Sequence, residues 1–125
     1  MREKQDAIPE EMYQLLQKIC QRLLDKKGRN ILTLDVRGIC TVADYFIIAE
    51  GNVDRHVQAL ASHVFDEMAA HHRKPYHVEG KEFGDWVVLD YGDIMVHLFT
   101  QEMREKYMLE QVWKEGSVVD IPLKL

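Results

Sequence analysis

The sequence predicts an α/β protein of the α+β kind, in which helices pack on a mixed β-sheet of about five strands. Two observations predict this class. Apolar residues recur at helical spacing in the longer segments, and five shorter segments are rich in β-branched and aromatic residues. Along the chain these segments give the order α-β-β-α-β-β-β-α, which indicates a layered fold of helices on a sheet.

The length of 125 residues suits one domain. We expect this domain to span residues 1–125, with its core at about 10–114. No internal repeat, linker or low-complexity segment divides it. Residues 115–125 show no strong pattern, and so we expect them to form a loosely held tail.

The first half of the chain begins with a helix and two strands. Residues 9–27 carry an apolar stripe, with Pro9 suited to the start of a helix and Gly28 just past its end. Residues 30–36 alternate between apolar and polar side chains. Residues 45–49 are apolar throughout, which predicts a strand in the centre of the sheet.

The second half begins with another amphipathic helix, for which Asn52 or Asp54 can supply the N-cap. A short strand is predicted at 76–79, before a β-hairpin. A last helix, capped by Thr100, is predicted to extend towards Trp113.

The hairpin is predicted by Gly92-Asp93, which stands between two β-rich runs. Because side chains alternate along a strand, a two-residue loop places six apolar residues on one face. These are Val87, Leu89, Tyr91, Ile94, Val96 and Leu98. The other face carries Trp86, Val88, Asp90, Met95, His97 and Phe99. This second face mixes aromatic rings with a carboxylate and an imidazole, so either a helix covers it or it stays open to a partner.

Charge and composition exclude several classes of function. The net charge of −5 argues against broad nucleic-acid binding, which relies on Lys and Arg, and favours a basic partner. No apolar run is long enough to predict a membrane span. The first twelve residues lack the apolar core of a signal peptide. We therefore expect a cytoplasmic protein with reduced thiols at Cys20 and Cys40.

Many spaced motifs resemble one known family. They are Leu34-Asp35, Gly38, Asp44-Tyr45-Phe46-Ile47-Ile48-Ala49, Gly51, Arg55-His56, Gly80, Asp85-Trp86, Leu89-Asp90-Tyr91-Gly92-Asp93, Val96-His97, Phe99, Arg104, Tyr107, Leu109-Glu110 and Trp113. Together they resemble the ribosomal silencing factor family, also called Iojap-like proteins, over roughly residues 10–114. The sequence departs from the family at Glu50 and Asp54, where Thr and Ser are usual.

The resemblance implies a function and a fold. Family members bind the large ribosomal subunit through its fourteenth protein, a basic protein on the intersubunit surface. They block joining of the small subunit, which represses translation when nutrients are scarce. Organellar relatives are linked to ribosome assembly, which is the alternative role. The resemblance also implies a minimal nucleotidyltransferase fold, and it implies dimers, since family members are often seen as such.

The second face of the hairpin is therefore the predicted docking surface. Aromatic anchors ringed by polar groups are typical of binding hot spots. The predicted partner-binding residues are Arg55, His56, Trp86, Val88, Asp90, Tyr91, Gly92, Asp93, Met95 and His97. Arg55 and His56 belong to this set because a cation in the first turn opposes the helix dipole and because the family motif includes both.

An enzyme and a metalloprotein are the rival interpretations. A nucleotidyltransferase needs a Gly-Ser turn and two carboxylates that project together from one strand. Here the turn is Gly51-Asn52, and a turn separates Asp90 from Asp93. His56 and His63 share a helix face, but no second close pair completes a zinc set. We therefore predict no catalytic residue, no metal and no cofactor.

Overall fold

The computed structural model describes residues 7–125, with Val112 described by its backbone alone. The first six residues of the predicted domain lie outside this part of the chain. The described elements are α1 (Glu10–Asp25), β1 (Arg29–Asp35), β2 (Tyr45–Gly51), α2 (Asp54–Ala70), β3 (His77–Glu79), β4 (Trp86–Asp90), β5 (Ile94–Thr100), α3 (Gln101–Tyr107), α4 (Leu109–Val112) and β6 (Ser117–Val118).

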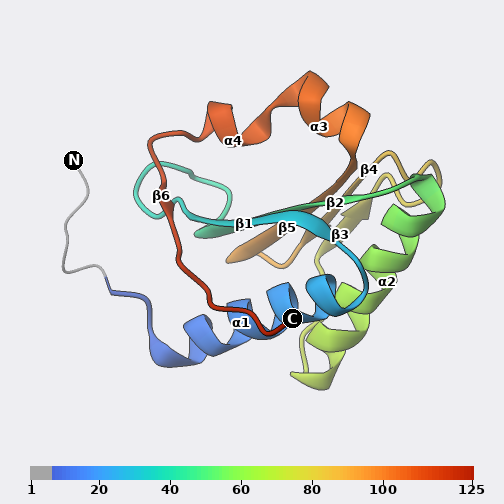
Figure 1. The fold of residues 1–125 in the computed structure, drawn as a ribbon. Coiled ribbons are helices and arrows are strands. Elements are labelled where there is room, and N and C mark those ends of the chain that lie inside the picture. The colour runs from blue at the N-terminus through green and yellow to red at the C-terminus, as the bar shows by residue number, and fades with distance from the viewer. Residues whose placement is uncertain (1–6) are drawn as a thin grey trace.

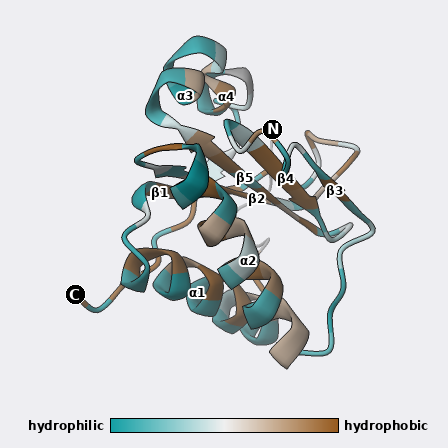
Figure 2. Cartoon of the chain, turned by 90° about the vertical axis from the view of Figure 1, so that its right-hand side faces the viewer, coloured by the Kyte–Doolittle hydropathy of each residue, from teal (hydrophilic) through white to brown (hydrophobic). Residues whose placement is uncertain are grey.

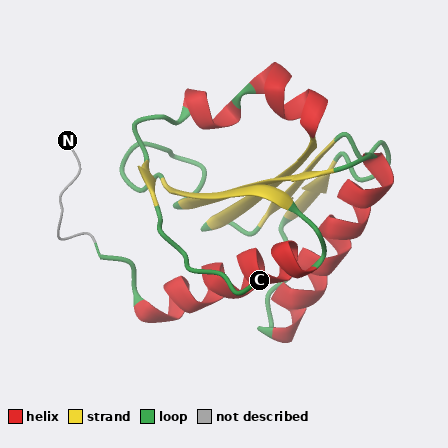
Figure 3. Ribbon diagram, in the orientation of Figure 1, coloured by secondary structure: helices red, strands yellow, loops and turns green. Residues whose placement is uncertain are grey.

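The elements form three layers, in which one mixed sheet lies between two layers of helices (Figure 1). The six strands lie in the order β3-β4-β5-β2-β1-β6. β2 and β5 are parallel, and every other neighbouring pair is antiparallel. Helices α1 and α2 lie on one side of the sheet, and α3 and α4 lie on the other (Figures 1 and 3). The predicted mixed α+β class and the order of its first eight elements are confirmed.

The larger core lies between the sheet and the helices α1 and α2, and we call this side the inner face. The apolar stripes of both helices point at the sheet. The outer surface of α1 is hydrophilic, whereas that of α2 is mixed (Figure 2) and includes the exposed Phe65. All seven residues of β2 are buried, which confirms the predicted central strand. The side of the sheet that faces α3 and α4 is the outer face, where a smaller cluster forms around Phe46, Ile48 and Phe99.

The β4–β5 hairpin has the predicted register. Trp86 pairs with Phe99 and Asp90 with Met95, so the turn contains Gly92 and Asp93 alone. Gly92 has φ +88°, and the N–H of Tyr91 donates to the carbonyl of Ile94 at 2.8 Å. A positive φ at the first central residue is typical of the type II′ turn that hairpins favour.

The helix termini depart from the prediction in two places. The N-cap of α2 is Val53, which has no side-chain cap, because Asp54 Oδ1 accepts from the adjacent Arg55 N–H and Asn52 lies one residue too early. At the end of α1 the left-handed residue is Lys27 (φ 72°), and Gly28 follows it. The N–H of Gly28 donates to the Leu23 carbonyl at 2.7 Å, as in a Schellman motif.

Replacing Lys27 by glycine is expected to raise the free energy of unfolding by about 0.5–1 kcal/mol, because glycine adopts a positive φ without steric cost. Thermal or urea unfolding measures the gain. Lys26→Gly is the matched control: Lys26 has φ −101°, so the same substitution one residue earlier is expected to bring no gain. An equal gain in both variants would contradict the conformational cause.

The C-terminal region differs most from the prediction. The expected single helix after Thr100 is two helices, because Met108 takes a left-handed conformation (φ 48°) between α3 and α4. Thr100 does cap α3, since its side chain accepts from the Met103 N–H at 3.4 Å. A break of this kind has no local sequence signal, since methionine is an ordinary helix former.

The tail is docked rather than loosely held. β6 pairs with β1 at the edge of the sheet and adds the sixth strand. Beyond it, Tyr13 donates to the Asp120 carbonyl at 2.9 Å, and Gln21 exchanges two hydrogen bonds with the backbone of Lys124, at 2.8 and 2.9 Å. These contacts hold the tail along α1, where Figure 1 shows it as the red C-terminal segment. Within residues 7–125 no helix has the length and apolar character needed to cross a membrane.

Candidate docking surface

The outer face is covered unevenly by the helices above it. α3 contacts β2 and β5, whereas β4 and β3 extend beyond it (Figure 2). Phe99 is fully buried and His97 is 5% exposed. Four residues at the uncovered side are half-buried, and we call them the outer patch: Trp86, Val88, Asp90 and Met95. The second face of the hairpin is therefore partly core and partly surface.

Trp86 is the centre of an aromatic group. Its ring centroid lies 4.9 Å from that of Phe99 and 4.8 Å from that of Tyr107 on α3. The indole Nε1–H donates to His97 Nδ1 at 3.2 Å. These contacts hold the indole in one orientation while part of its surface stays open, which is the arrangement of a rigid aromatic anchor.

His97 lies beneath Trp86 as a neutral imidazole. Because Nδ1 accepts from Trp86, the proton is placed on Nε2, which is buried and has no hydrogen-bond partner among the described residues. Burial lowers the pKa of His97 to about 4, and the nearby charge of Asp90 opposes this only in part. The imidazole thus supports the indole and carries no charge near neutral pH.

The polar side chains in and beside the hairpin turn lie on two different sides of the sheet. Asp90 Oδ1 accepts from the Gly92 N–H at 2.8 Å, so this carboxylate of the outer patch also holds the turn. Tyr91 faces inward, is buried, and burial raises its pKa to about 12. Asp93 forms an ion pair with Arg73, which leaves it facing the inner side.

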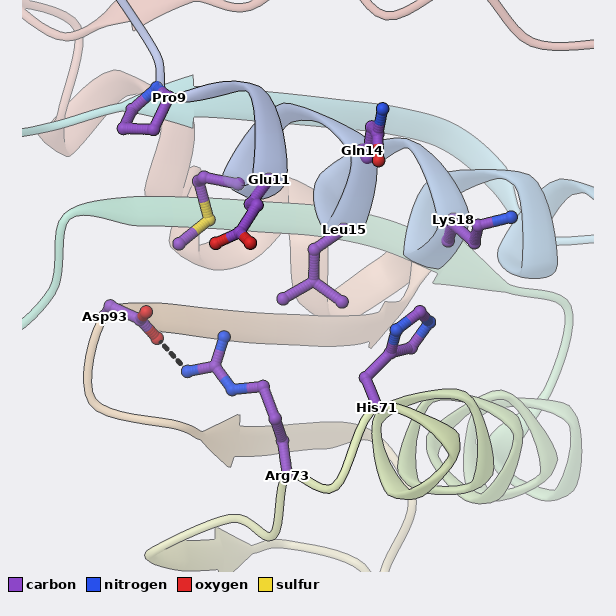
Figure 4. A pocket seen from close by; sticks show the side chains of 9 residues that line it. Pro9, Glu11, Gln14, Leu15, Lys18, His71, Arg73 and Asp93 are labelled. Atoms are coloured by element: carbon purple, nitrogen blue, oxygen red, sulfur yellow. Dashed lines mark hydrogen bonds and ion pairs between the residues drawn. The ribbon is translucent and has the colours of Figure 1, made fainter.

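Asp93 belongs to a cavity on the inner side rather than to the outer patch. The cavity has a volume of about 570 Å³ and lies between α1, the end of α2 and the hairpin turn. Figure 4 shows Leu15 and Lys18 above it and the Arg73–Asp93 pair below. Its lining combines apolar side chains with both signs of charge.

The other two predicted residues begin α2, which packs on the inner face. Arg55 is exposed. His56 has a structural role: Nδ1 accepts from the Asn52 N–H at 2.9 Å, so Nε2 carries the proton and donates to the Lys26 carbonyl at 2.9 Å. Among the predicted partner-binding residues, the structure therefore places Trp86, Val88, Asp90 and Met95 in the outer patch. It places Arg55, His56, Tyr91 and Asp93 elsewhere.

Two features beside the outer patch were not among the predicted site residues. Tyr107 is 44% exposed and forms the rim of the patch. Arg104 Nε donates to Glu110 Oε1 at 3.0 Å, and its Nη1 lies 3.3 Å from Glu50 Oε2. The family motif had pointed to Arg104, Tyr107 and Glu110, but helical spacing alone does not separate them from an ordinary helix face.

The carboxylate and histidine side chains that could bind a metal ion or act in catalysis lie apart in the described part of the chain. Among the described residues, no group of three or more His, Cys, Asp or Glu side chains is placed to hold a metal ion. The carboxylates of Asp90 and Asp93 are engaged by Gly92 and Arg73 respectively, and they point to different sides of the sheet.

Comparison with known proteins gives consistent matches along most of the chain. A family model described as "Ribosomal silencing factor during starvation" matches residues 9–124. The ribosomal silencing factor of Bacillus subtilis is 39% identical over 97 residues, covering 78% of this chain and 82% of the relative. That of Zymomonas mobilis is 37% identical over 122 residues, covering 98% and 90%.

An organellar relative and a solved structure extend these matches. The mouse protein named "mitochondrial assembly of ribosomal large subunit protein 1" is 35% identical over 102 residues, which cover 78% of this chain and 44% of the mouse protein. A crystal structure of a protein from Chromobacterium violaceum matches with a TM-score of 0.78 at 29% identity, covering 89% of this chain and 92% of that one. The likeness thus covers both sequence and fold.

Proposed function

Because the chain belongs to the family of ribosomal silencing factors, we propose that it binds the large ribosomal subunit and prevents the small subunit from joining. The partner on that subunit is its basic fourteenth protein, and the outer patch is the docking surface. The result is repression of translation in the cytoplasm, through the presence of the bound protein alone. No bond is made or broken, so no cofactor is needed.

The outer patch supports this proposal by its composition. Trp86 offers a rigid indole with part of its surface open, and Val88 and Met95 extend the apolar area. Asp90 adds a carboxylate that can accept charge-assisted hydrogen bonds from Lys or Arg. A half-buried aromatic anchor beside an acidic group is suited to a basic protein surface.

Replacing Trp86 by alanine is expected to weaken binding to the large subunit by about 2 kcal/mol or more, close to thirtyfold, because the anchor is lost. Cosedimentation with purified large subunits measures this. Since Trp86 also packs on Phe99, Val88→Asp is a second variant that keeps the indole and instead places a charge in the apolar contact.

Phe83→Ala is the matched control for this test. Phe83 is 76% exposed but lies in the loop before β4, outside the outer patch, so its removal is expected to leave binding unchanged. Full retention of subunit binding in both Trp86→Ala and Val88→Asp would remove the outer patch as the docking surface.

Assembly of the large subunit is the alternative role, and the name of the mouse relative favours it. The same docked complex can serve both roles, so the distinction lies in what it does to joined ribosomes. Loss of joined ribosomes when the protein is added supports silencing. Cosedimentation with large subunits without that loss supports assembly. Heat released on mixing with nucleotide and magnesium would instead favour the nucleotidyltransferase alternative.

We also propose that two copies of the chain form a homodimer through the same surface. A second copy on the outer patch would bury Trp86 and would compete with the ribosomal protein. In that case sedimentation of the free protein at rising concentration shows a dimer, and Trp86→Ala weakens both dimer and subunit binding.

A further inference from the structure

The chain that follows α2 carries the basic run His71-His72-Arg73-Lys74, which the proposed docking surface does not use. His72 has φ 62°, and the N–H groups of His72 and Arg73 donate to the Ala69 and Met68 carbonyls at 2.9 and 3.0 Å. These two bonds form a Schellman motif, which turns the chain away from the helix axis. The turn places Arg73 opposite α1, in the lining of the cavity of about 570 Å³ on the inner side (Figure 4).

The cavity is polarised along its length. Figure 4 shows Glu11 and Asp93 at one end and Lys18 and His71 at the other, with Arg73 between them. Glu11 and Lys18 are seven residues apart on α1, so the rise of the helix separates the two ends by about 10 Å. The cavity therefore offers a carboxylate and an ammonium group, one at each end, to an elongated ligand.

Several charged groups of the lining are left free by the protein. Among the described residues, the exposed side chains of Glu11 and Lys18 have neither an ion-pair nor a hydrogen-bond partner. Arg73 donates to Asp93 from Nη2 alone, so Nε and Nη1 have no acceptor within the same part of the chain. A ligand can bind these groups without breaking a contact of the fold.

Met12 and Leu15 form an apolar wall between the two charged ends. Both are half-buried and pack against the larger core, so the wall is held in place. In Figure 4 the Leu15 side chain points from α1 into the cavity, towards Arg73. An apolar side chain of a ligand would leave water by packing on this wall, which favours binding.

We propose that the cavity binds a short peptide of about three residues, with free termini and an apolar side chain. Its amino terminus donates to the Glu11 carboxylate, and its carboxyl terminus accepts from Lys18. Arg73 donates to a peptide carbonyl from the nitrogens that Asp93 leaves free, and the apolar side chain packs on Leu15. An extended chain rises about 3.3 Å per residue, so three residues match the separation of the two ends.

The arrangement of charge favours such a peptide over other small ligands. A single amino acid is too short to reach both ends of the cavity. The carboxylates of Glu11 and Asp93 repel nucleotides and other phosphorylated compounds, and the cations of Lys18 and Arg73 repel polyamines. A free peptide supplies one charge of each sign at the required separation, whatever its sequence.

The inference goes beyond the proposed function and does not depend on it. The cavity lies on the side of the sheet that α1 and α2 cover, whereas the outer patch lies on the other side (Figure 1). Trp86→Ala is therefore expected to retain peptide binding even where it loses the large subunit. Failure of one proposal can thus be told apart from failure of the other.

The test is an NMR titration of the full chain, labelled with ¹⁵N, with the tripeptide Gly-Leu-Gly. We expect saturable shifts of the amides of residues 11–18, 71–73 and 93. The same peptide with an acetylated amino terminus, or with an amidated carboxyl terminus, lacks one of the two charges. Each is expected to bind about tenfold more weakly, since one charge-assisted hydrogen bond is lost.

Glu11→Gln is expected to weaken binding of Gly-Leu-Gly about tenfold and to leave binding of the acetylated peptide unchanged, because that peptide has no amino charge. Glu10→Gln is the matched control, since Glu10 is the exposed neighbour of Glu11 on α1 and does not line the cavity. It is expected to change neither. The absence of saturable shifts, equal binding of the three peptides, or equal effects of the two substitutions would overturn the proposal.

Discussion

Replacing Arg104 by methionine is expected to lower the free energy of unfolding by about 3–5 kcal/mol, because it leaves a buried carboxylate without its cation. The Glu50 side chain is 7% exposed, and among the described residues Arg104 is its only ion-pair partner. The Asn30 amide also donates to Glu50 Oε2 at 3.0 Å, but a neutral donor does not balance the charge. The Glu110 carboxylate loses its partner at the same time.

Urea unfolding at neutral pH, followed by tryptophan fluorescence, measures this loss. Lys106→Met is the control on the same helix: Lys106 is exposed, so the change is expected to stay within about 0.5 kcal/mol. Adding Glu50→Gln to Arg104→Met is expected to recover part of the stability, because the stranded charge is removed. A loss below about 1 kcal/mol in Arg104→Met would show that this cluster contributes little to the fold.

Lowering the pH from about 6.5 to about 4 is expected to remove up to about 3 kcal/mol of stability through His97 alone. The pKa of His97 in the folded protein is about 4, since burial disfavours the imidazolium. In the unfolded chain a histidine titrates near 6.5. Between these two values the unfolded state binds a proton that the folded state does not, so stability falls as the pH falls.

His97→Gln tests this dependence. The glutamine oxygen can still accept from Trp86 Nε1, but the side chain no longer titrates. We expect the variant to lose less stability than the parent protein between pH 6.5 and 4. The difference corresponds to the uptake of about one proton fewer on unfolding. His77→Gln, an exposed residue of β3, serves as the control. If the ring signals of His97 titrate near 6.5 in an NMR experiment, the buried-neutral interpretation is wrong.

The loss of stability in acid and the proposed binding to the large subunit are linked through the outer patch. His97 accepts the hydrogen bond of the Trp86 indole, and a protonated ring cannot accept it. Acid therefore acts on the support of the proposed anchor as well as on the core. We expect subunit binding to weaken as the pH falls through about 4, where the folded protein takes up this proton.

Much of this architecture was determined by local sequence pattern. The apolar stripes of α1 and α2, the alternation in the strands and the Gly92-Asp93 turn each depend on residues close in sequence. The parity of the hairpin placed Trp86 and Tyr91 on opposite faces, and the structure agrees. The family resemblance followed from the sequence as well, because its spaced motifs can be recognised without knowing which residues are in contact.

Only the tertiary structure decided how much of the outer face is open. Whether α3 and α4 cover Trp86 depends on the break at Met108 and on the ion pairs of Arg104 with Glu50 and Glu110. Arg104 lies 54 residues from Glu50, and the tail at Lys124 reaches Gln21 across 103 residues. Contacts at such separation leave no periodic signal in the sequence, because they form only once the sheet has brought distant segments together.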